Sequence, residues 1–210
     1  MNRRSLLKNS AAAFSGVLLT SKVLQAKTPA QPEGPFYPVV DQIDKDADLI
    51  RVDGKSQIAA GKIVIVSGRV IDQNNQPVTN ARVEIWQACD SGKYDHPADP
   101  NTAPLDPNFQ YWGIAQTNNL GEYKFRTIIP GTYPAGSGWV RPPHIHFKIS
   151  ALGYIELITQ MYFAGETLND NDLIFKRLSK SDQNKVVVNF IAQENEKHPI
   201  GIFNIEIEKI

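Results

Sequence analysis

The chain has 210 residues with 22 basic and 22 acidic side chains, so its formal net charge at pH 7 is zero. Nucleic-acid binding depends on a clustered basic surplus, and this balance argues against it. Hydrophobic residues make up 41% of the chain and charged residues 21%, which excludes wholesale disorder and fibrous repeats. The single cysteine, Cys89, excludes an intrachain disulfide and a cysteine-based zinc cage, so any metal must be held by His, carboxylate or Tyr.

The first 26 residues have the segment order of an export signal. Arg3 and Arg4 precede a short apolar stretch, and a small-residue cleavage site ends at Ala26. The apolar stretch is too short to span a bilayer comfortably. The arginine pair resembles a twin-arginine signal, which exports folded and often cofactor-loaded proteins. We therefore expect a signal peptide at 1–26 and a periplasmic or exported mature protein, 27–210, with no membrane segment; an amphipathic N-terminal helix is the alternative.

The mature chain begins with an arm, 27–60, that contains several prolines and lacks periodicity, so we expect it to be irregular. After the arm, short β-like runs follow one another between turn signals, and one amphipathic helix is predicted at 170–180. Seven such runs in one chain are typical of an all-β fold, an antiparallel β-sandwich with one short helix. The runs are 63–70, 81–87, 121–127, 144–150, 156–163, 185–191 and 201–208.

Two segments without secondary-structure signals are long enough to indicate a function. The first, 90–112, is rich in Asp, Pro and Asn, and the second, 129–139, leads into the run that begins at His144. A structureless connection of such length inside a compact domain is more often functional than accidental. We therefore look for the active site in these two loops.

The run at 144–150 alternates polar and apolar residues. Side chains of a strand face opposite sides in turn, so His144, His146 and Lys148 share one face while the intervening apolar residues face the core. The two histidine Cα atoms are then about 7 Å apart, from which both rings can converge on one ion. A pair of surface histidines on an edge strand explains the same pattern equally well.

A metal site would need further ligands, and the carboxylate of a two-His-one-carboxylate iron site is missing after His146. The first acid downstream is Glu156. The two loops instead offer Gly-x-Tyr positions that end at Tyr94 and Tyr133. A loop tyrosine is ordinarily a packing residue, so the pattern by itself leaves both interpretations open.

Eight sequence blocks between residues 31 and 175 follow one another in the order found in a known enzyme family: PEGPFY (32–37), VEIWQA (83–88), GKY (92–94), APLDPNF (103–109), YKFRTI (123–128), GTYP (131–134), RPPHIHF (141–147) and LITQMYF (157–163). Together they resemble the intradiol ring-cleavage dioxygenases, especially the protocatechuate 3,4-dioxygenase chains. The resemblance implies a transthyretin-like β-sandwich with long active-site loops. It also implies insertion of both atoms of O₂ into a catecholic ring, which is cleaved between its two hydroxylated carbons to a muconate-type diacid.

The resemblance also implies a cofactor and its ligands. The family binds a non-haem Fe(III) through two tyrosines and two histidines, which correspond here to Tyr94, Tyr133, His144 and His146. By the same analogy, Tyr133 is the ligand that is released to accept a substrate proton.

Two further residues receive catalytic roles by analogy. Arg141 stabilises the ketonised substrate, and Gln160 lies near the oxygen pocket, although a plain hydrogen-bonding role in the sheet explains Gln160 equally well. Protocatechuate enzymes pair two unlike chains at each site, so the expected partners are the catechol, O₂, and either a second related subunit or further copies of this chain.

Two other functions remain open at this point. A transthyretin-like binding or structural module would use the Tyr and His cluster to hold iron or a catechol without turnover. A zinc hydrolase would use His144 and His146, but the missing carboxylate disfavours it.

Overall fold

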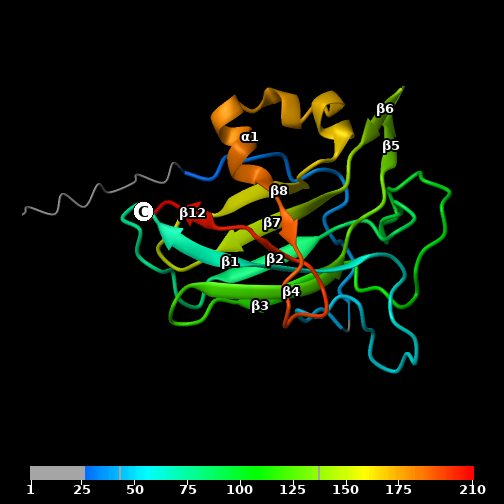
Figure 1. Cartoon of the computed structure of the whole chain (residues 1–210), viewed down its shortest axis with the longest axis horizontal. Helices are drawn as coiled ribbons and strands as arrows, with labels where there is room; N and C mark the ends of the chain where they lie inside the picture. Colours follow the sequence, from blue (N-terminus) through cyan, green and yellow to red (C-terminus); the bar gives the residue numbers. More distant parts are fainter. Residues whose placement is uncertain (1–26, 43, 137) are drawn as a thin grey trace, which may run out of the picture.

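The computed structural model describes residues 27–42, 44–136 and 138–210 (Figure 1). The signal peptide expected at 1–26 lies outside these residues and stays a prediction. Among the described residues, no helix has the length and apolar character needed to cross a membrane.

The first sheet is built around its longest strand, β1. Strand β4 pairs antiparallel with β1 along one edge, while β11 and β12 pair parallel with successive parts of the other edge. Strand β10 extends the sheet beyond β11. The strands are β1 (Ile63–Asp72), β4 (Glu122–Ile128), β10 (Phe190–Ile191), β11 (Ile200–Ile202) and β12 (Ile205–Ile207).

The second sheet has the order β3-β2-β7-β8-β9 and carries the predicted histidine strand near its centre. Its pairings are antiparallel except for the parallel pair β8–β9. A separate two-stranded hairpin, β5–β6, leads into β7. The strands are β2 (Arg82–Trp86), β3 (Trp112–Gln116), β5 (Tyr133–Gly136), β6 (Trp139–Arg141), β7 (His144–Ser150), β8 (Leu157–Phe163) and β9 (Val187–Val188).

The two sheets pack face to face over one apolar core. Phe125 of β4 and Val66 of β1 meet Ile145, Phe147 and Ile149 of β7 there. All five side chains are fully buried. The alternation of β7 therefore places its apolar residues between the sheets, as predicted, and turns its histidines to the outer face of the second sheet.

The N-terminal arm covers sheet edges that would otherwise expose unpaired backbone groups. Gln31 donates its backbone N–H to the carbonyl of Ile158 on β8 at 2.9 Å. Further along, Leu49 donates to the carbonyl of Arg126 on β4 at 2.8 Å, and Ile114 of β3 donates to Lys45. The irregular arm expected at 27–60 is thus part of the fold, because it completes the hydrogen bonding of three strands.

The all-β sandwich is confirmed, with differences in detail. The run at 201–208 divides into β11 and β12, and 185–191 was wrong as one strand because its first residues end a helix. Strand β5 lies inside the loop expected at 129–139, while β6 and β3 begin at the last residues of the loops expected at 129–139 and 90–112 and were not predicted. These strands are only three to five residues long, too short for alternation to reveal them.

The helix predicted at 170–180 was wrong. That segment forms two 3₁₀ turns, η1 (Thr167–Asn171) and η2 (Phe175–Arg177), and the short α-helix α1 (Lys180–Val186) follows it. The side chain of Asp172 accepts backbone hydrogen bonds from Ile174 and Phe175, which ends η1 and prevents a continuous helix. The start of α1 is set by Ser179, whose hydroxyl accepts from the backbone N–H of Asp182.

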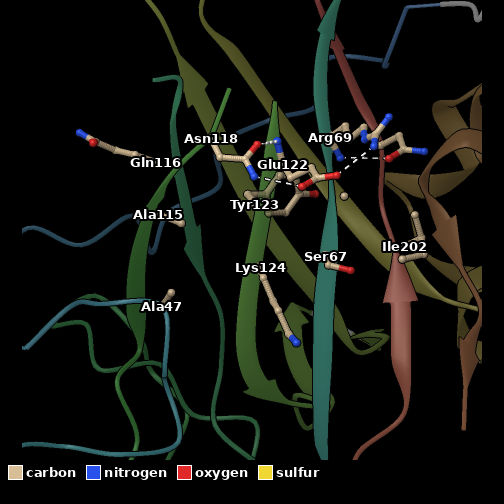
Figure 2. A pocket seen from close by; sticks show the side chains of 12 residues that line it. Ala47, Ser67, Arg69, Ala115, Gln116, Asn118, Glu122, Tyr123, Lys124 and Ile202 are labelled. Atoms are coloured by element: carbon tan, nitrogen blue, oxygen red, sulfur yellow. Dashed lines mark hydrogen bonds and ion pairs between the residues drawn. The ribbon is translucent and has the colours of Figure 1, made fainter. Parts of the chain in front are cut away.

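A groove of about 840 Å³ lies over the outer face of the first sheet (Figure 2). Ser67 and Arg69 of β1, Glu122 and Lys124 of β4 and Ile202 of β11 are among the residues that line it. None of the residues that line this groove is a predicted metal ligand, so the groove is separate from the predicted chemistry.

Glu84 of β2 ties the arm to the second sheet. Its buried carboxylate accepts hydrogen bonds from Arg82 Nε at 2.8 Å, Trp112 Nε1 at 2.9 Å and the Tyr37 hydroxyl at 3.1 Å. Burial alone would raise the pKa of Glu84, but the hydrogen bonds and the charge of Arg82 outweigh burial and hold this pKa below 4.5. Burial and the same carboxylate raise the pKa of Tyr37 to about 12, so its hydroxyl remains a donor.

We predict that Glu84→Gln lowers the free energy of unfolding near neutral pH by about 1–3 kcal/mol, because it weakens three hydrogen bonds to a buried group. A carboxyl group whose folded-state pKa is depressed stabilises the fold above its unfolded-state pKa. The difference between wild type and variant should therefore disappear as the pH falls below 4.5 and through the folded-state pKa of Glu84.

Urea unfolding at neutral and acidic pH measures this difference. Glu122→Gln is the control, because Glu122 forms an exposed pair with Arg69 and should change stability little at either pH. A loss of stability in Glu84→Gln that persists unchanged in acid would contradict the assignment.

Candidate metal centre and active site

The four predicted metal ligands come together on the outer face of the second sheet. His144 and His146 lie on β7, Tyr94 lies in the loop between β2 and β3, and Tyr133 begins β5. All four side chains are buried, with exposed fractions of 2%, 2%, 2% and 5% respectively. The long loops and the β5–β6 hairpin gather at the end of the sandwich away from the C-terminus (Figure 1).

Two glycines explain how the tyrosine loops approach each other. Gly92 has a φ of +80°, and a Cβ there would lie 2.1 Å from the carbonyl oxygen of Thr132. A Cβ on Gly131 would lie 2.3 Å from the carbonyl oxygen of Asp90. The two loops therefore pack backbone against backbone, which only glycine permits at both positions. Each Gly-x-Tyr motif combines a close-approach residue with a phenol two residues later.

The aromatic rings of the four residues surround a common space. The centroids of Tyr94 and Tyr133 are 5.4 Å apart, and their planes are nearly perpendicular at 89°. His144 and His146 are 4.9 Å apart, and Tyr133 lies 5.7 Å from His144. The Tyr94 hydroxyl is 3.5 Å from His144 Nε2. The four rings are thus close neighbours, and the polar atoms of two of them, Tyr94 and His144, approach each other directly.

The histidines are held in a form that can donate a lone pair. His144 Nδ1 lies 2.7 Å from the carbonyl oxygen of Pro142 and donates its N–H to that oxygen. The proton of the imidazole is therefore on Nδ1, and Nε2 is unprotonated with a lone pair available to a metal ion. Trp86 stacks on His146 at 4.8 Å and 13°, and His146 Nδ1 is buried without a hydrogen-bond partner among the described residues. Burial, with the charge of Arg141, holds the pKa of both histidines well below 6.5, so both are neutral.

The phenols are protonated in the absence of a cation. Burial raises the pKa of Tyr94 well above 10, and the neighbouring Tyr133 raises it further. Burial also raises the pKa of Tyr133, although Arg141 opposes this rise. A bound multivalent cation reverses this preference, because it displaces the phenolic proton as it does that of bound water.

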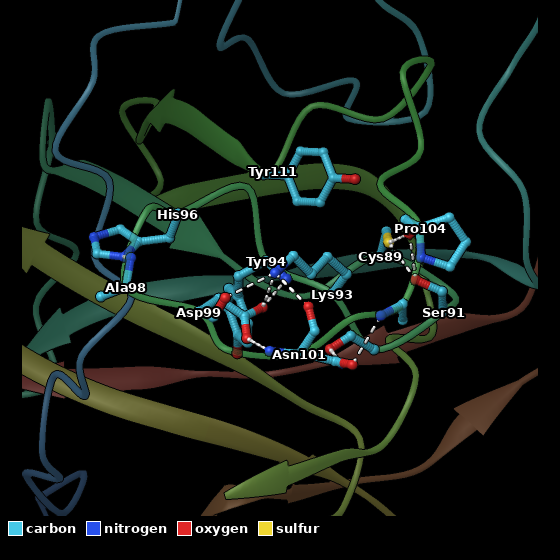
Figure 3. A network of polar contacts seen from close by, with 12 residues as sticks. Cys89, Ser91, Lys93, Tyr94, His96, Ala98, Asp99, Asn101, Pro104 and Tyr111 are labelled. Carbon is cyan, nitrogen blue, oxygen red and sulfur yellow. Dashed lines mark hydrogen bonds and ion pairs between the residues drawn. The ribbon is translucent and has the colours of Figure 1, made fainter.

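The loop that carries Tyr94 is held by a network of hydrogen bonds (Figure 3). The Asp99 carboxylate accepts from the backbone N–H of Tyr94 at 2.7 Å, and the Lys93 ammonium donates to the carbonyls of Asp99 and Asn101. The Asn101 amide in turn donates to the carbonyl of Gly92 at 2.9 Å. The segment 90–112, which was predicted to contribute to the active site, is thus tied to itself around Tyr94 by several hydrogen bonds.

Arg141 lies beside the four rings, and its neighbours include a residue that sequence analysis missed. Its Nη2 donates to Gln160 Oε1 at 2.8 Å, and its Nε donates to Asp172 Oδ2 at 2.8 Å. Asp172 is fully buried. Sequence analysis missed Asp172 because a helix was expected at 170–180, and an isolated acid in an amphipathic helix is ordinarily exposed. The one local sign that Asp172 is buried is its position directly before the apolar residues Leu173 and Ile174.

The donor set fits a trivalent iron better than it fits zinc. Nowhere in the described ranges do three or more His, Cys, Asp or Glu side chains form a group able to hold a metal ion. The residues at the site instead supply two phenols, which are hard anionic donors when deprotonated, and two neutral imidazoles. Zinc sites use thiolate, imidazole and carboxylate ligands, of which only imidazole is present here.

Comparison with known proteins agrees with this geometry. A family model described as Dioxygenase matches residues 32–207. The protocatechuate 3,4-dioxygenase beta chain of Burkholderia cepacia is 38% identical over 172 residues, which are 80% of this chain and 73% of that protein. The hydroxyquinol 1,2-dioxygenase of Rhizobium sp. (strain MTP-10005) is 29% identical over 184 residues, which are 77% of this chain and 59% of that protein.

Solved structures of the same kind share the fold. An intradiol ring-cleavage dioxygenase from Tetranychus urticae has a TM-score of 0.68 at 26% identity, and the match covers 87% of this chain and 95% of that one. The dioxygenase domain of a dioxygenase–carbohydrate-binding fusion from Streptomyces sp. SirexAA-E has a TM-score of 0.65 at 27% identity, with 88% and 100% covered.

These matches and the geometry define the class of protein as a ring-cleaving dioxygenase built on a β-sandwich. The chain belongs to the intradiol ring-cleavage dioxygenase family and is an oxidoreductase of that type. The resemblance noted in the sequence is thereby confirmed.

We predict that Gly92→Ala destabilises the fold and separates the two tyrosine loops, because the new Cβ would clash with a backbone carbonyl. Gly153→Ala is the matched control, since Gly153 has nearly the same φ, +82°, and nothing lies within 4 Å of its Cβ position. The control measures left-handed backbone strain alone, about 1–2 kcal/mol.

Urea unfolding and iron content of the two purified variants provide the comparison. Gly92→Ala should lose more stability than the control and should lose iron, which the control retains. Equal losses of stability together with equal iron contents would show that the loop contact does not organise the site.

Proposed function

We propose that Tyr94, Tyr133, His144 and His146 hold one non-haem Fe(III), and that the enzyme uses it to cleave a catecholic ring. The observation that carries this proposal is the convergence of four buried rings on one space without any carboxylate. When bound, ferric iron supplies Lewis acidity that binds the catechol as its dianion and draws electron density from the ring toward the metal, which makes ring carbon reactive toward O₂. The residues of the chain bind and orient the substrate and exchange protons with it.

The two phenols have different surroundings, which supports different roles. Tyr94 is fixed through its backbone by Asp99, whereas Tyr133 pairs with Arg141 across the β5–β6 hairpin. We assign proton exchange with the substrate to the Tyr133 hydroxyl, because a positive charge beside a phenol favours its anionic form. Tyr94 is assigned as the ligand that stays in place.

Arg141 is assigned to stabilising negative charge on the ketonised substrate. Its side chain is 4% exposed, so the charge acts in a site from which water is largely excluded. Preorganised donors in such a site commonly contribute a few kcal/mol, about 3–4 kcal/mol for one oxyanion donor. Burial, and after it the positive charge of this guanidinium, lowers the pKa of both histidines.

Gln160 is assigned to the polar wall of the oxygen pocket. It pairs with His146 in the β7–β8 register and is fully buried. Its amide nitrogen donates to the carbonyl of Pro32 at 2.8 Å, and its oxygen accepts from Arg141. The same oxygen also accepts from the Tyr162 hydroxyl of β8 at 3.3 Å, so the alternative expected from sequence, a sheet hydrogen-bonder, stays open.

The substrate class that we propose is a catechol bound together with O₂. The relative from Burkholderia cepacia is named as a beta chain, which supports a multi-subunit enzyme for that protein. We propose by analogy that this chain functions with further copies of itself or with a second related subunit.

We predict that Tyr94→Phe and His146→Ala lose iron and the visible colour of a ferric phenolate, because each removes one of four donors. Tyr154→Phe and His198→Ala are the matched controls, since both residues lie outside the cluster. Purified wild type should be wine-red, and its colour should change when catechol is added without oxygen. Full iron content and colour in either site variant would contradict the ligand assignment.

The same preparations separate the alternative functions. Coloured protein that consumes no O₂ with any of a panel of catechols would support a binding module without turnover. Colourless protein that contains zinc would support a hydrolase. An oxygen electrode and metal analysis decide between these results, and we expect O₂ consumption with release of a ring-opened diacid.

We also propose that the protein is exported to the periplasm through a twin-arginine signal at 1–26, on the basis of Arg3, Arg4 and the cleavage site at Ala26. The double substitution Arg3→Lys with Arg4→Lys should retain the full-length protein in the cytoplasm of the producing bacterium. Cell fractionation and mass determination of the N-terminus measure this. Periplasmic accumulation of the double variant at the wild-type level would overturn the proposal.

A further inference from the structure

We infer that Asp172 is a positioning residue, which fixes the guanidinium of Arg141 so that its remaining donors face the substrate. The inference rests on the function proposed above. Arg141 Nε donates to Asp172 Oδ2 at 2.8 Å, and the side chains are 4% and 0% exposed. Among the ion pairs of the described residues, this one is the most deeply buried.

The carboxylate of Asp172 is itself held from its other side. Its Oδ1 accepts from the backbone N–H groups of Phe175 at 2.8 Å and Ile174 at 3.0 Å. The backbone N–H of Asp172 donates to the carbonyl of Asn169 at 3.1 Å, and its carbonyl accepts from Lys176 at 3.0 Å. The junction of η1 and η2 is therefore built around one residue, whose side chain holds the start of η2 and whose backbone N–H closes η1.

The opposite side of the guanidinium is also anchored. Arg141 Nη2 donates to Gln160 Oε1 at 2.8 Å and to the Tyr162 hydroxyl at 3.3 Å. The N-terminal arm fixes these two acceptors, because Gln160 donates to Pro32 and the Tyr162 hydroxyl donates to Gln31 Oε1 at 3.2 Å. These contacts use Nε and Nη2, and no hydrogen bond of Nη1 is found among the described residues.

This arrangement matters because an arginine side chain is long and carries about 2 kcal/mol of rotamer entropy. A donor stabilises developing charge most effectively when it is already oriented, since no reorganisation is then needed during the reaction. Asp172 supplies that orientation and also neutralises Arg141, whose charge would otherwise be buried close to the bound cation.

The isosteric variant Asp172→Asn tests the inference. In one orientation the new amide oxygen accepts the backbone hydrogen bonds of η2, and the new NH₂ group then faces the Nε–H of Arg141, so that two donors meet. In the flipped orientation the NH₂ group faces the backbone N–H groups of Ile174 and Phe175 instead. Either orientation releases the guanidinium from its position. Asp170→Asn is the matched control, because it removes the same charge from an exposed position two residues away.

We expect Asp172→Asn to retain iron and the ferric phenolate colour, with KM for the catechol little changed and kcat lowered between about tenfold and a hundredfold. Asp170→Asn should match wild type in all of these. In metal-free protein, NMR should show a slowly exchanging Nε–H signal for Arg141, assigned with Arg141→Lys, which Asp172→Asn loses and Asp170→Asn keeps. Asp172→Glu should restore part of kcat, because it returns a carboxylate that is displaced by one methylene.

Unchanged kcat in Asp172→Asn, or loss of iron in parallel with activity, would overturn the inference. Should that variant fail to fold, Asp172→Glu carries the test: lowered kcat with unchanged KM supports it, and wild-type kcat overturns it. A wild type without ring-cleaving activity would refute the proposed function instead, whereas the NMR signal of metal-free protein would still decide whether Asp172 holds Arg141.

Discussion

The candidate site depends on the contact between two backbones. Gly92 and Gly131 let the loops that precede Tyr94 and Tyr133 touch without side chains between them. Two phenols from distant parts of the sequence are thereby brought together, with their ring centroids 5.4 Å apart. The sheet supplies the other half of the site, since alternation along β7 turns both imidazoles toward the same outer face. Loop contact and strand alternation together produce four donors around one space.

The N-terminal arm links stability to the site. It completes the edges of β8, β4 and β3 through backbone hydrogen bonds, and Glu84 anchors it at Tyr37. Between these anchors, Gly34 approaches so closely that a Cβ there would lie 3.3 Å from His146 Cε1. A segment without regular secondary structure therefore covers the face that carries the proposed metal ligands, and loosening the arm would expose that face to water.

Local patterns predicted much of this arrangement, and non-local contacts account for the rest. Strict alternation at 144–150 gave the strand and the orientation of its histidines, which the structure confirms. The ring contacts of the two tyrosines needed the family resemblance, because nothing local distinguishes a ligand phenol from a packing phenol. Asp172 was missed because its partner is 31 residues away, and the helix expected at 170–180 was wrong because that side chain binds its own backbone. The hairpin β5–β6 was missed because both strands are short and β5 contains Pro134 and Gly136.

Anomalous diffraction at the iron absorption edge, from crystals of the purified protein, tests the central claim most directly. The account predicts a single iron peak enclosed by the side-chain oxygens of Tyr94 and Tyr133 and by imidazole nitrogens of His144 and His146. An iron peak elsewhere in the molecule, or full ring-cleaving activity in crystals whose site holds no iron, would contradict it.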